Sequence, residues 1–332
     1  MKARSVYFLL FGLLFGSQYM LAQSPFYSQY MVDKFLVNPA IAGANGVSSV
    51  NLISRQQYVG FVNAPQTFAL TGQTRLIEDS YIMRAMRLRK DTKKKSRSGR
   101  VGLGGSIYSD RNGIVHRTGA QFTYAYHINV SNEWQISGGI SVMGYQYRID
   151  DGDVPYLEIG DPMIETTRKS FFVPDASTGA FVTNGQLYAG FGITDLLGSY
   201  IKLGKDVYGN FSTPRKYNVM AGYKIPVTSL IDVEPSILVQ GTRTNFSMDI
   251  SARMYYMQNY WAALSYRSTN SLILILGGRF DMFYLGYAYD LNLGLVQSYT
   301  SGSHELILGV RFGDNNTRRF RWFKQDERNF EI

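Results

Sequence analysis

The chain has 332 residues, of which 45% are hydrophobic and none is Cys, and it carries a formal charge of +9. This composition excludes wholesale disorder. The lack of Cys excludes a disulfide framework, a Cys-ligated metal site, a cysteine nucleophile and a lipid-modified N-terminal Cys. A helical membrane protein needs apolar runs of about 20 residues, and beyond the N-terminus the densest run is only Leu272–Leu276. If the chain lies in a membrane, it has to cross without helices.

The N-terminus has the organisation of an export signal. Lys2 and Arg4 precede a short apolar stretch at 6–15, and small and polar residues follow up to Ala22. We expect cleavage after Ala22 and export of the mature chain. A permanent membrane anchor is the alternative, but the apolar stretch is short for a bilayer span.

From Val50 onward, apolar and polar residues alternate with a period of two. Between 231 and 243, for example, Ile231 and Val233 alternate with Asp232 and Glu234. Such alternation over ten or more residues predicts β-strands. The length suits membrane-spanning strands, which need roughly 9–11 residues, better than soluble ones of about 5–6. We predict fourteen strands, at about 50–59, 66–76, 101–110, 115–128, 133–149, 176–183, 186–194, 214–224, 231–243, 246–256, 260–268, 271–281, 283–292 and 303–312.

An all-β transmembrane antiparallel barrel explains this pattern better than a soluble sandwich, which has shorter strands. Aromatic residues near strand ends favour a membrane girdle: Tyr124, Tyr126, Trp134, Tyr145, Tyr147, Tyr255, Tyr256, Tyr260, Trp261, Tyr284, Tyr287 and Tyr289. With an even strand number, both ends of the wall lie on the periplasmic side. The long connections 150–175, 195–213 and 293–302 then face outward, and 77–100 faces the periplasm. The predicted organisation is a signal peptide at 1–22, an N-terminal segment at 23–49, the barrel at 50–312 and a periplasmic tail at 313–332.

Motifs near both ends of the mature chain carry a family resemblance. The first is Gln-Ser-Pro-Phe-Tyr-Ser-Gln-Tyr-Met at 23–31, followed by Asn-Pro-Ala-Ile-Ala-Gly at 38–43. Arg-Gln-Gln-Tyr-Val-Gly-Phe and Ala-Pro-Gln-Thr come next, at 55–61 and 64–67. Gly-Tyr-Ala-Tyr-Asp at 286–290 and Ser-Gly-Ser-His-Glu-Leu at 301–306 complete the set. The chain resembles the PorP/SprF family of outer-membrane proteins of the Bacteroidetes type IX secretion system.

The resemblance implies a role in secretion, gliding motility or surface anchoring of adhesins, through protein interaction and without chemistry. It implies as partners a secreted type IX cargo or adhesin C-terminal domain, periplasmic components of the secretion system and outer-membrane lipid, with no cofactor and no nucleic acid. The motif positions, for which we expect structural roles, are Asn38, Pro39, Gly43, Arg55, Gly60, Phe61, Pro65, Tyr289, Asp290, Gly302, His304, Glu305 and Phe312.

Two charged stretches are candidate partner-binding sites. The first lies between 84 and 100, where nine basic residues stand against Asp91 alone, and its members are Arg84, Arg87, Arg89, Lys90, Lys93, Lys94, Lys95, Arg97 and Arg100. This basic run predicts docking of an acidic periplasmic partner or of anionic lipid, and a solvated loop is the alternative. The second is the tail, where Arg321, Trp322 and Phe323 have the composition of an interaction hot spot or of a membrane-surface anchor.

The segment 23–49 contains Pro25, Pro39 and Gly43 and cannot form one continuous strand or helix. We expect it to enter the lumen from the periplasmic side and to plug it partly; a mobile leader is the alternative. The three histidines have no metal-ligand spacing. His304 and Glu305 alternate onto opposite faces of the last strand, so with Asp290 they suggest a structural clamp that closes the barrel.

No catalytic or phosphate-binding motif occurs in the sequence, and we expect no enzyme activity, cofactor or metal. The leading hypothesis is an integral outer-membrane barrel, with both termini periplasmic, that binds a secreted partner through its outer loops. A porin or hydrophobic-solute channel is the alternative. A barrel enzyme comes third.

Overall fold

The structure is a computed structural model that describes residues 27–76, 100–130, 134–149, 170–198, 200–202 and 210–312. Three short 3₁₀ helices occur, η1 (Lys34–Leu36), η2 (Pro39–Ile41) and η3 (Leu295–Tyr299). In these ranges no helix has the length and apolar character needed to cross a membrane. The strands are β1 Ser48–Gln56, β2 Gln66–Leu76, β3 Val101–Asn112, β4 Val115–Asn129, β5 Gln135–Ile149, β6 Ser170–Thr183, β7 Leu187–Thr194, β8 Tyr200–Lys202, β9 Asn210–Ser212, β10 Lys216–Tyr223, β11 Ile225–Pro226, β12 Ile231–Gly241, β13 Phe246–Tyr256, β14 Tyr260–Arg267, β15 Ser271–Phe280, β16 Phe283–Asn292 and β17 Ser303–Phe312.

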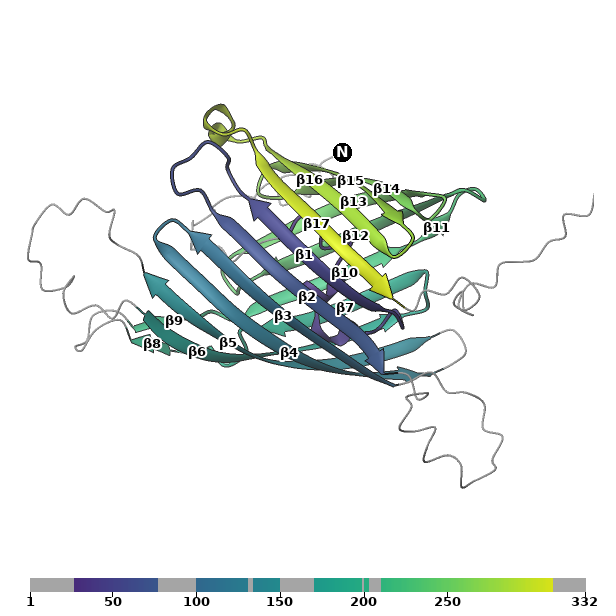
Figure 1. Ribbon diagram of the computed structural model, residues 1–332, viewed down its shortest axis with the longest axis horizontal. Helices are drawn as coiled ribbons and strands as arrows, with labels where there is room; N and C mark the ends of the chain where they lie inside the picture. Colours follow the sequence, from purple (N-terminus) through teal and green to yellow (C-terminus); the bar gives the residue numbers. More distant parts are fainter. Residues whose placement is uncertain are drawn as a thin grey trace, which may run out of the picture.

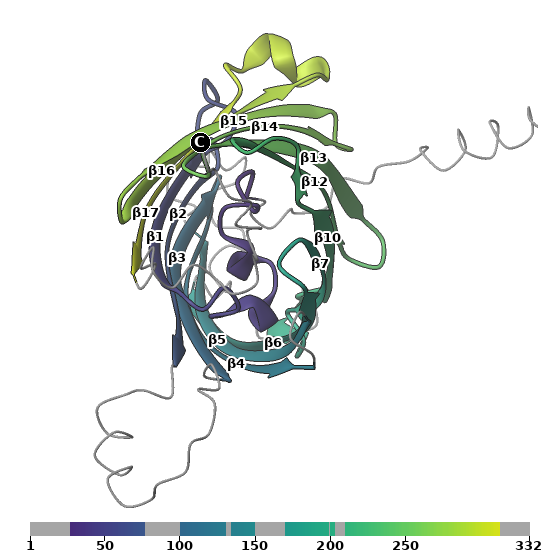
Figure 2. The ribbon, with the colours of Figure 1, turned by 90° about the vertical axis from the view of Figure 1, so that its right-hand side faces the viewer.

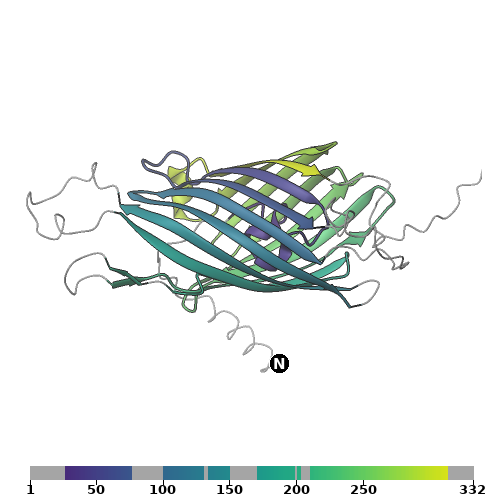
Figure 3. The same ribbon diagram turned by 60° about the horizontal axis from the view of Figure 1, so that its bottom comes forward.

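The wall is a closed antiparallel barrel of fourteen strands, as predicted. β11 continues β10 along β12, and β8 with β9 forms a separate two-stranded sheet. Neighbours in the chain pair with each other around the ring, and β1 pairs with β17 from Ser48↔Phe312 to Gln56↔His304. We call this β1–β17 pairing the seam, because the two ends of the wall meet there. Figures 1 and 3 show the tilted strands wrapped around a single lumen.

The alternation in sequence becomes an apolar exterior and a polar interior. In β4, Phe122 points outward and is 61% exposed, whereas its neighbour Thr123 points inward and is 0% exposed. Val142 of β5 is likewise 67% exposed between inward residues. An apolar outer band is what a barrel needs in order to lie in lipid, where no water replaces the protein's own hydrogen bonds.

The two mouths of the barrel differ in what they carry. The terminal end carries Ser48 and Phe312, the outer ends of the wall. The loop end carries the β1–β2 connection at 57–65 and the β16–β17 connection at 293–302.

The strands depart from the prediction most clearly in three places. β1 covers 48–56 rather than 50–59, because Tyr58 has a φ of +50°, which a strand does not accommodate. β6 begins at Ser170 rather than 176, and Pro174 lies inside it opposite Gly144. A proline argues against a central strand, so the sequence alone placed this stretch in the preceding loop. The β8–β9 hairpin lies in the predicted loop 195–213.

The predicted aromatic girdle is wrong for five of its members, which face the lumen. Five other members are exposed on the outside of the wall, as a girdle requires: Tyr124, Tyr126, Tyr256, Tyr260 and Tyr287. The residues whose position in the alternation turns them toward the lumen are Tyr145, Tyr147, Tyr255, Trp261 and Tyr284. The alternation predicts two faces but does not say which one an aromatic residue needs to fill, and this lumen is wide enough to take large rings.

Residues 27–47, which we call the lumenal segment, lie inside the barrel. In Figure 2 this purple stretch, with η1 and η2, is surrounded by the ring of strands. Phe35 is 2% exposed and Ala40 and Ala42 are 0% exposed. Tyr30, Met31 and Ile41 share an apolar cluster with inward residues of the wall such as Phe181, Met220, Leu238 and Ile273. The segment therefore serves as the core of the barrel.

Glycines of the wall let this segment approach closely. A methyl group at Gly139 would overlap the backbone of Pro39 and Ala40, and one at Gly102 would overlap the carbonyl of Ala42. The adjacent Gly138 points outward and would meet nothing within 4 Å. The inward glycines therefore mark where backbone packs against backbone.

The described part of the lumenal segment runs from the loop end toward the terminal end. Ser28 contacts Glu305 at the loop end of β17, whereas the carbonyl of Ala44 accepts a hydrogen bond from Arg75 near the terminal end of β2. Since β1 starts at the terminal end, the chain traverses the lumen before it enters the wall. The described part of the segment has its first residue, Tyr27, at the loop-end side.

A pair of cysteines tests this placement in a chain that has no other cysteine. The Cβ of Asn38 lies 3.7 Å from the position of a Cβ built on Gly192 of β7, inside the roughly 3.5–4.5 Å range of disulfides. We expect N38C/G192C to form a disulfide after export, seen as a mobility difference on non-reducing gels. The matched control N38C/G138C should remain reduced, because Gly138 faces outward. Equal oxidation of both pairs would contradict the lumenal placement.

Candidate functional site

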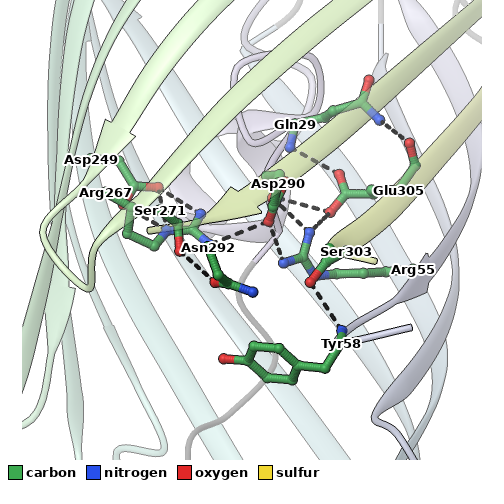
Figure 4. Close-up of polar contacts among 12 residues, drawn as sticks. Gln29, Arg55, Tyr58, Asp249, Arg267, Ser271, Asp290, Asn292, Ser303 and Glu305 are labelled. Atoms are coloured by element: carbon green, nitrogen blue, oxygen red, sulfur yellow. Dashed lines mark hydrogen bonds and ion pairs between the residues drawn. The ribbon is translucent and has the colours of Figure 1, made fainter. Parts of the chain in front are cut away.

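A buried ion cluster crosses the seam at the loop end (Figure 4). The guanidinium of Arg55 on β1 lies 2.6 Å from Asp290 Oδ2 on β16 and 3.0 Å from Glu305 Oε2 on β17. All three side chains are less than 5% exposed. Arg55 and Glu305 face each other directly in the β1–β17 register. Buried charges are tolerated only when paired and hydrogen-bonded, and here each charge has its partner on another strand.

The lumenal segment completes this cluster, which we call the seam cluster. The backbone N–H groups of Ser28 and Gln29 donate to the two oxygens of Glu305 at 2.8 and 2.9 Å. The Ser28 hydroxyl accepts from Arg55 at 2.6 Å and donates to Asp290 at 2.6 Å. The cluster therefore joins the two ends of the wall and fixes the start of the described lumenal segment.

A second arginine extends the cluster along the wall. Arg267 on β14 donates to both oxygens of Asp249 on β13, at 2.7 to 3.1 Å, and its Nη1 lies 3.8 Å from Asp290 Oδ2. Two guanidiniums thus serve three carboxylates, and the backbone donors on Glu305 offset the remaining negative charge.

The motif at 38–43 shapes the middle of the lumenal segment. Asn38 caps η2, since its Oδ1 accepts from Ala40 N at 2.9 Å, and its Nδ2 donates to two wall carbonyls, at Ala180 and Phe191. Pro39 occupies the first turn of η2, where a proline costs no hydrogen bond. Gly43 has a φ of +70° and lies against the backbone of Thr74 and Gly102. These three positions have structural roles.

The remaining motif residues at the loop end form two connected loops, 57–65 and 293–302, which we call the paired loops. Val59 N donates to Gly302 O at 2.9 Å, and Ser301 N donates back to Val59 O at 2.8 Å. Gly60 and Gly302 have φ of +112° and +89°. The Pro65 carbonyl accepts from Gln57 N at 2.8 Å and closes the base of the first loop. Phe61 lies edge-on to Tyr58 and is 44% exposed.

Other motif residues lie on the outside of the wall. His304 faces the opposite side from Glu305, and its Nδ1 is 2.6 Å from the hydroxyl of Tyr287. Tyr289 packs beside the His304 ring and donates its hydroxyl hydrogen to Ser301 O at 3.2 Å. Phe312 is 49% exposed at the terminal end. Asp290 and Glu305 thus act together without His304.

A further ion cluster holds η1 near the terminal end. Glu234 on β12 lies 3.1 Å from Lys34 Nζ and 2.8 Å from Arg253 on β13. The hydroxyls of Tyr188 and Tyr255 also donate to Glu234, at 3.0 and 3.1 Å. Glu234 therefore joins η1 to β12 and β13.

Asp33 binds the segment to the opposite part of the wall. Its Oδ2 accepts from Asn51 at 2.7 Å and from Thr71 at 2.5 Å. Closer to the terminal end, His127 bridges Ser137 and the carbonyl of Ala42 at 2.7 and 2.9 Å. These two contacts give His127 a structural role.

Several predicted sites lie outside the described residues: the signal peptide, the tail with Arg321, Trp322 and Phe323, and the basic run up to Arg97. The same holds for the acidic residues of the predicted outer loop, from Asp150 to Glu165. Of the basic run only Arg100 is described. It is exposed and donates to the Tyr126 hydroxyl at 3.3 Å.

The sequence did not reveal the partners of these clusters. Ser28 and Gln29 belong to a quoted motif, but nothing in the sequence joins them to Glu305, which lies 276 and 277 positions away. Arg267, Asp249 and Glu234 occupy inward positions of predicted strands, so a charged residue at an inward position is the signal that could have found them. Among the described residues no group of three or more His, Cys, Asp or Glu could hold a metal ion.

The sequence matches one family model, described as "Type IX secretion system membrane protein PorP/SprF", over residues 20–310. No curated protein matches the chain.

Solved outer-membrane barrels share the general architecture at low identity. The toluene transporter TbuX of Ralstonia pickettii is 10% identical with a TM-score of 0.46, and the alignment covers 83% of this chain and 92% of TbuX. The CymD monoaromatic hydrocarbon channel is 10% identical at 0.46, with 88% and 94% covered. The toluene transporter TodX of Pseudomonas putida is 7% identical at 0.43, with 87% and 93% covered. Nothing about solutes follows from likeness at this level.

Removal of Arg55 tests the energetic role of the seam cluster. We expect R55A to lower the free energy of unfolding in urea by about 3–5 kcal/mol, because Asp290 and Glu305 would be left buried without their cation. The exposed Arg243 in the β12–β13 turn is a matched control, and R243A should cost less than about 0.5 kcal/mol. The double variant R55Q/E305Q should recover part of the stability that the single variant R55Q loses. Equal stability of R55A and R243A would refute this role.

Proposed function

Because the chain belongs to the PorP/SprF family of type IX secretion system membrane proteins, we propose that this outer-membrane barrel binds a secreted surface protein at its loop end and periplasmic machinery at its terminal end. The family match over residues 20–310 carries the secretion role. The role is one of protein binding, without an enzyme activity or a cofactor, and the bound cargo is a secreted protein or adhesin C-terminal domain.

The occupied lumen supports a binding role over conduction of solutes. The lumenal segment is buried and is bonded to the wall at the seam cluster, at Asp33, at Lys34 and at Ala42. These attachments are distributed along the length of the lumen. A passage for solutes would require them to be broken, and the buried charges of Glu234 and Glu305 would then lose hydrogen-bond or ion-pair partners.

The proposed orientation places the terminal end in the periplasm. Barrels with an even strand number have both wall ends on that side, together with the short turns. Here the turns 184–186, 257–259 and 281–282 lie at the terminal end, where β2 also ends and β3 begins. The longer connections after β5, β7 and β16 lie at the loop end. The proposed position of the loop end is therefore the cell exterior.

Purification in gentle detergent followed by mass spectrometry tests the proposed function. Recovery of a secreted surface protein together with periplasmic secretion components supports it. Recovery of the barrel alone, with steady conductance in planar bilayers, favours the alternative of a porin or hydrophobic-solute channel.

Deletion of residues 27–44 tests the plug. We expect the native barrel to conduct weakly in planar bilayers, and the deletion to raise single-channel conductance at least tenfold, because a barrel of this size has a lumen wide enough for ions once it is emptied. The oxidised N38C/G192C protein is the control that keeps the segment in place, and it should conduct as weakly as the native barrel. Strong conductance by the native protein would contradict a plugging role.

Neutralisation of the basic run tests the periplasmic contact. We expect Lys93, Lys94 and Lys95 changed to Gln to reduce recovery of periplasmic partners severalfold, most strongly at low salt, because salt screens the attraction between opposite charges beyond a Debye length of about 10 Å at 0.1 M. The matched control changes three exposed arginines at the loop end, Arg111, Arg215 and Arg243, to Gln. Both proteins should keep the same heat-modifiable gel mobility. Unchanged recovery with the lysine variant would rule out this contact.

A further inference from the structure

We propose that the tip of the paired loops, formed by Phe61, Val62 and Tyr299, is the docking surface through which the loop end binds an uncharged, apolar surface of the secreted protein partner. This inference rests on the proposed function and assigns it to particular residues.

The tip is apolar and strongly exposed. Val62 is 91% exposed, Tyr299 is 74% exposed and Phe61 is 44% exposed. The two loops are in contact at Gly60, since a Cβ built there would lie 3.5 Å from the Tyr299 carbonyl. Exposed apolar groups gathered in one place mark interaction sites, and aromatic residues are enriched where binding energy is concentrated.

A polar row separates this tip from the lipid-facing band. On β1 the outward residues Val50 and Leu52 are followed by Ser54 and Gln56 toward the loop end. Gln56 pairs with Gln66 of β2 on one side and with His304 of β17 on the other. The row Gln66, Gln56 and His304 therefore crosses three strands between the apolar band and the loops. The tip lies beyond this row and is not a continuation of the membrane surface.

The absence of charged residues from the paired loops indicates which kind of partner they bind. Residues 57–65 and 293–302 contain no Asp, Glu, Lys, Arg or His. Phosphate-bearing lipid headgroups are bound by Lys and Arg, and a charged protein surface would need an opposite charge. An uncharged apolar protein surface is the occupant that these residues fit.

The seam cluster holds the paired loops in position. Arg55 is followed after one residue by the first loop, whereas Asp290 and Glu305 flank the second. The same three residues are joined through the Ser28 hydroxyl or backbone. Tyr58 N also donates to Ser303 Oγ at 3.1 Å (Figure 4). Preorganised loops lose less conformational freedom on binding, so the buried cluster and the exposed tip act as one unit.

Charged substitutions at the tip test the proposal in the full-length exported protein. We expect V62E/Y299E to lower recovery of the secreted partner identified with the wild-type barrel by more than tenfold. Heat-modifiable mobility and recovery of periplasmic components should be unchanged. The matched control V130E/V227E places two glutamates at exposed valines of the terminal end, 63% and 59% exposed, and should recover the secreted partner as the wild type does.

A photoreactive phenylalanine derivative at position 62 gives a second readout. A covalent adduct with the same secreted protein supports the proposal, and adducts with lipid alone overturn it. Equal recovery of the partner by the wild type and V62E/Y299E overturns the docking surface while leaving the proposed function intact. Absence of any secreted partner from the wild type overturns the proposed function, and the docking surface with it.

Discussion

Burial of the Arg55 guanidinium is the constraint around which this barrel is organised. A buried cation needs carboxylates at hydrogen-bond distance, and Glu305 lies on β17 at the seam and Asp290 on the adjacent β16. Glu305 accepts two further hydrogen bonds from the backbone of Ser28 and Gln29, and the Arg267 guanidinium lies 3.8 Å from Asp290 Oδ2. One set of contacts therefore closes the wall, places the lumenal segment and fixes the loops.

The lumen is filled in the way that a protein core is filled, although its lining is polar. Small inward residues such as Gly102 and Gly139 accept the backbone of the segment, and large ones such as Tyr188 and Phe181 pack against its side chains. Polar groups of the segment meet partners on strands at different positions around the ring, for example Asp33 with Thr71 and Lys34 with Glu234. The segment thus joins parts of the wall that the sheet itself does not connect.

The fold could be predicted from the sequence because alternation has a period that only strands show. A predicted strand boundary was wrong where a single residue argued against a strand, as Pro174 does inside β6. The contacts within the candidate site could not be predicted in the same way. The motif drew attention to Arg55, Asp290 and Glu305, but their mutual contacts span 235 to 250 positions, and no local signal joins them. The position of Tyr145 or Trp261 inside the lumen depends on which face is inward, and the alternation alone leaves that open.

In the paired loops, too, some features could be predicted from the sequence and others could not. Gly60 and Gly302 could be expected at turns from residue type alone, whereas the exposure of Val62 depends on how far the loop projects from the wall. A motif in the sequence does not distinguish residues that are buried anchors from residues that are exposed for contact. The structure separates the two by burial, with Arg55 3% and Phe61 44% exposed.

The route of the lumenal segment has a consequence for biogenesis. β1 and β17 are the first and last strands of the wall, so Arg55 meets Glu305 only after the whole barrel sequence has been made and inserted. Contacts of such long range are slow to form, because loop-closure entropy has to be overcome first. A chain that ends before β17 would lack Glu305, leaving Ser28 and Gln29 without their acceptor and the ring open. Closure of the ring and anchoring of the lumenal segment at the loop end therefore both require the last strand.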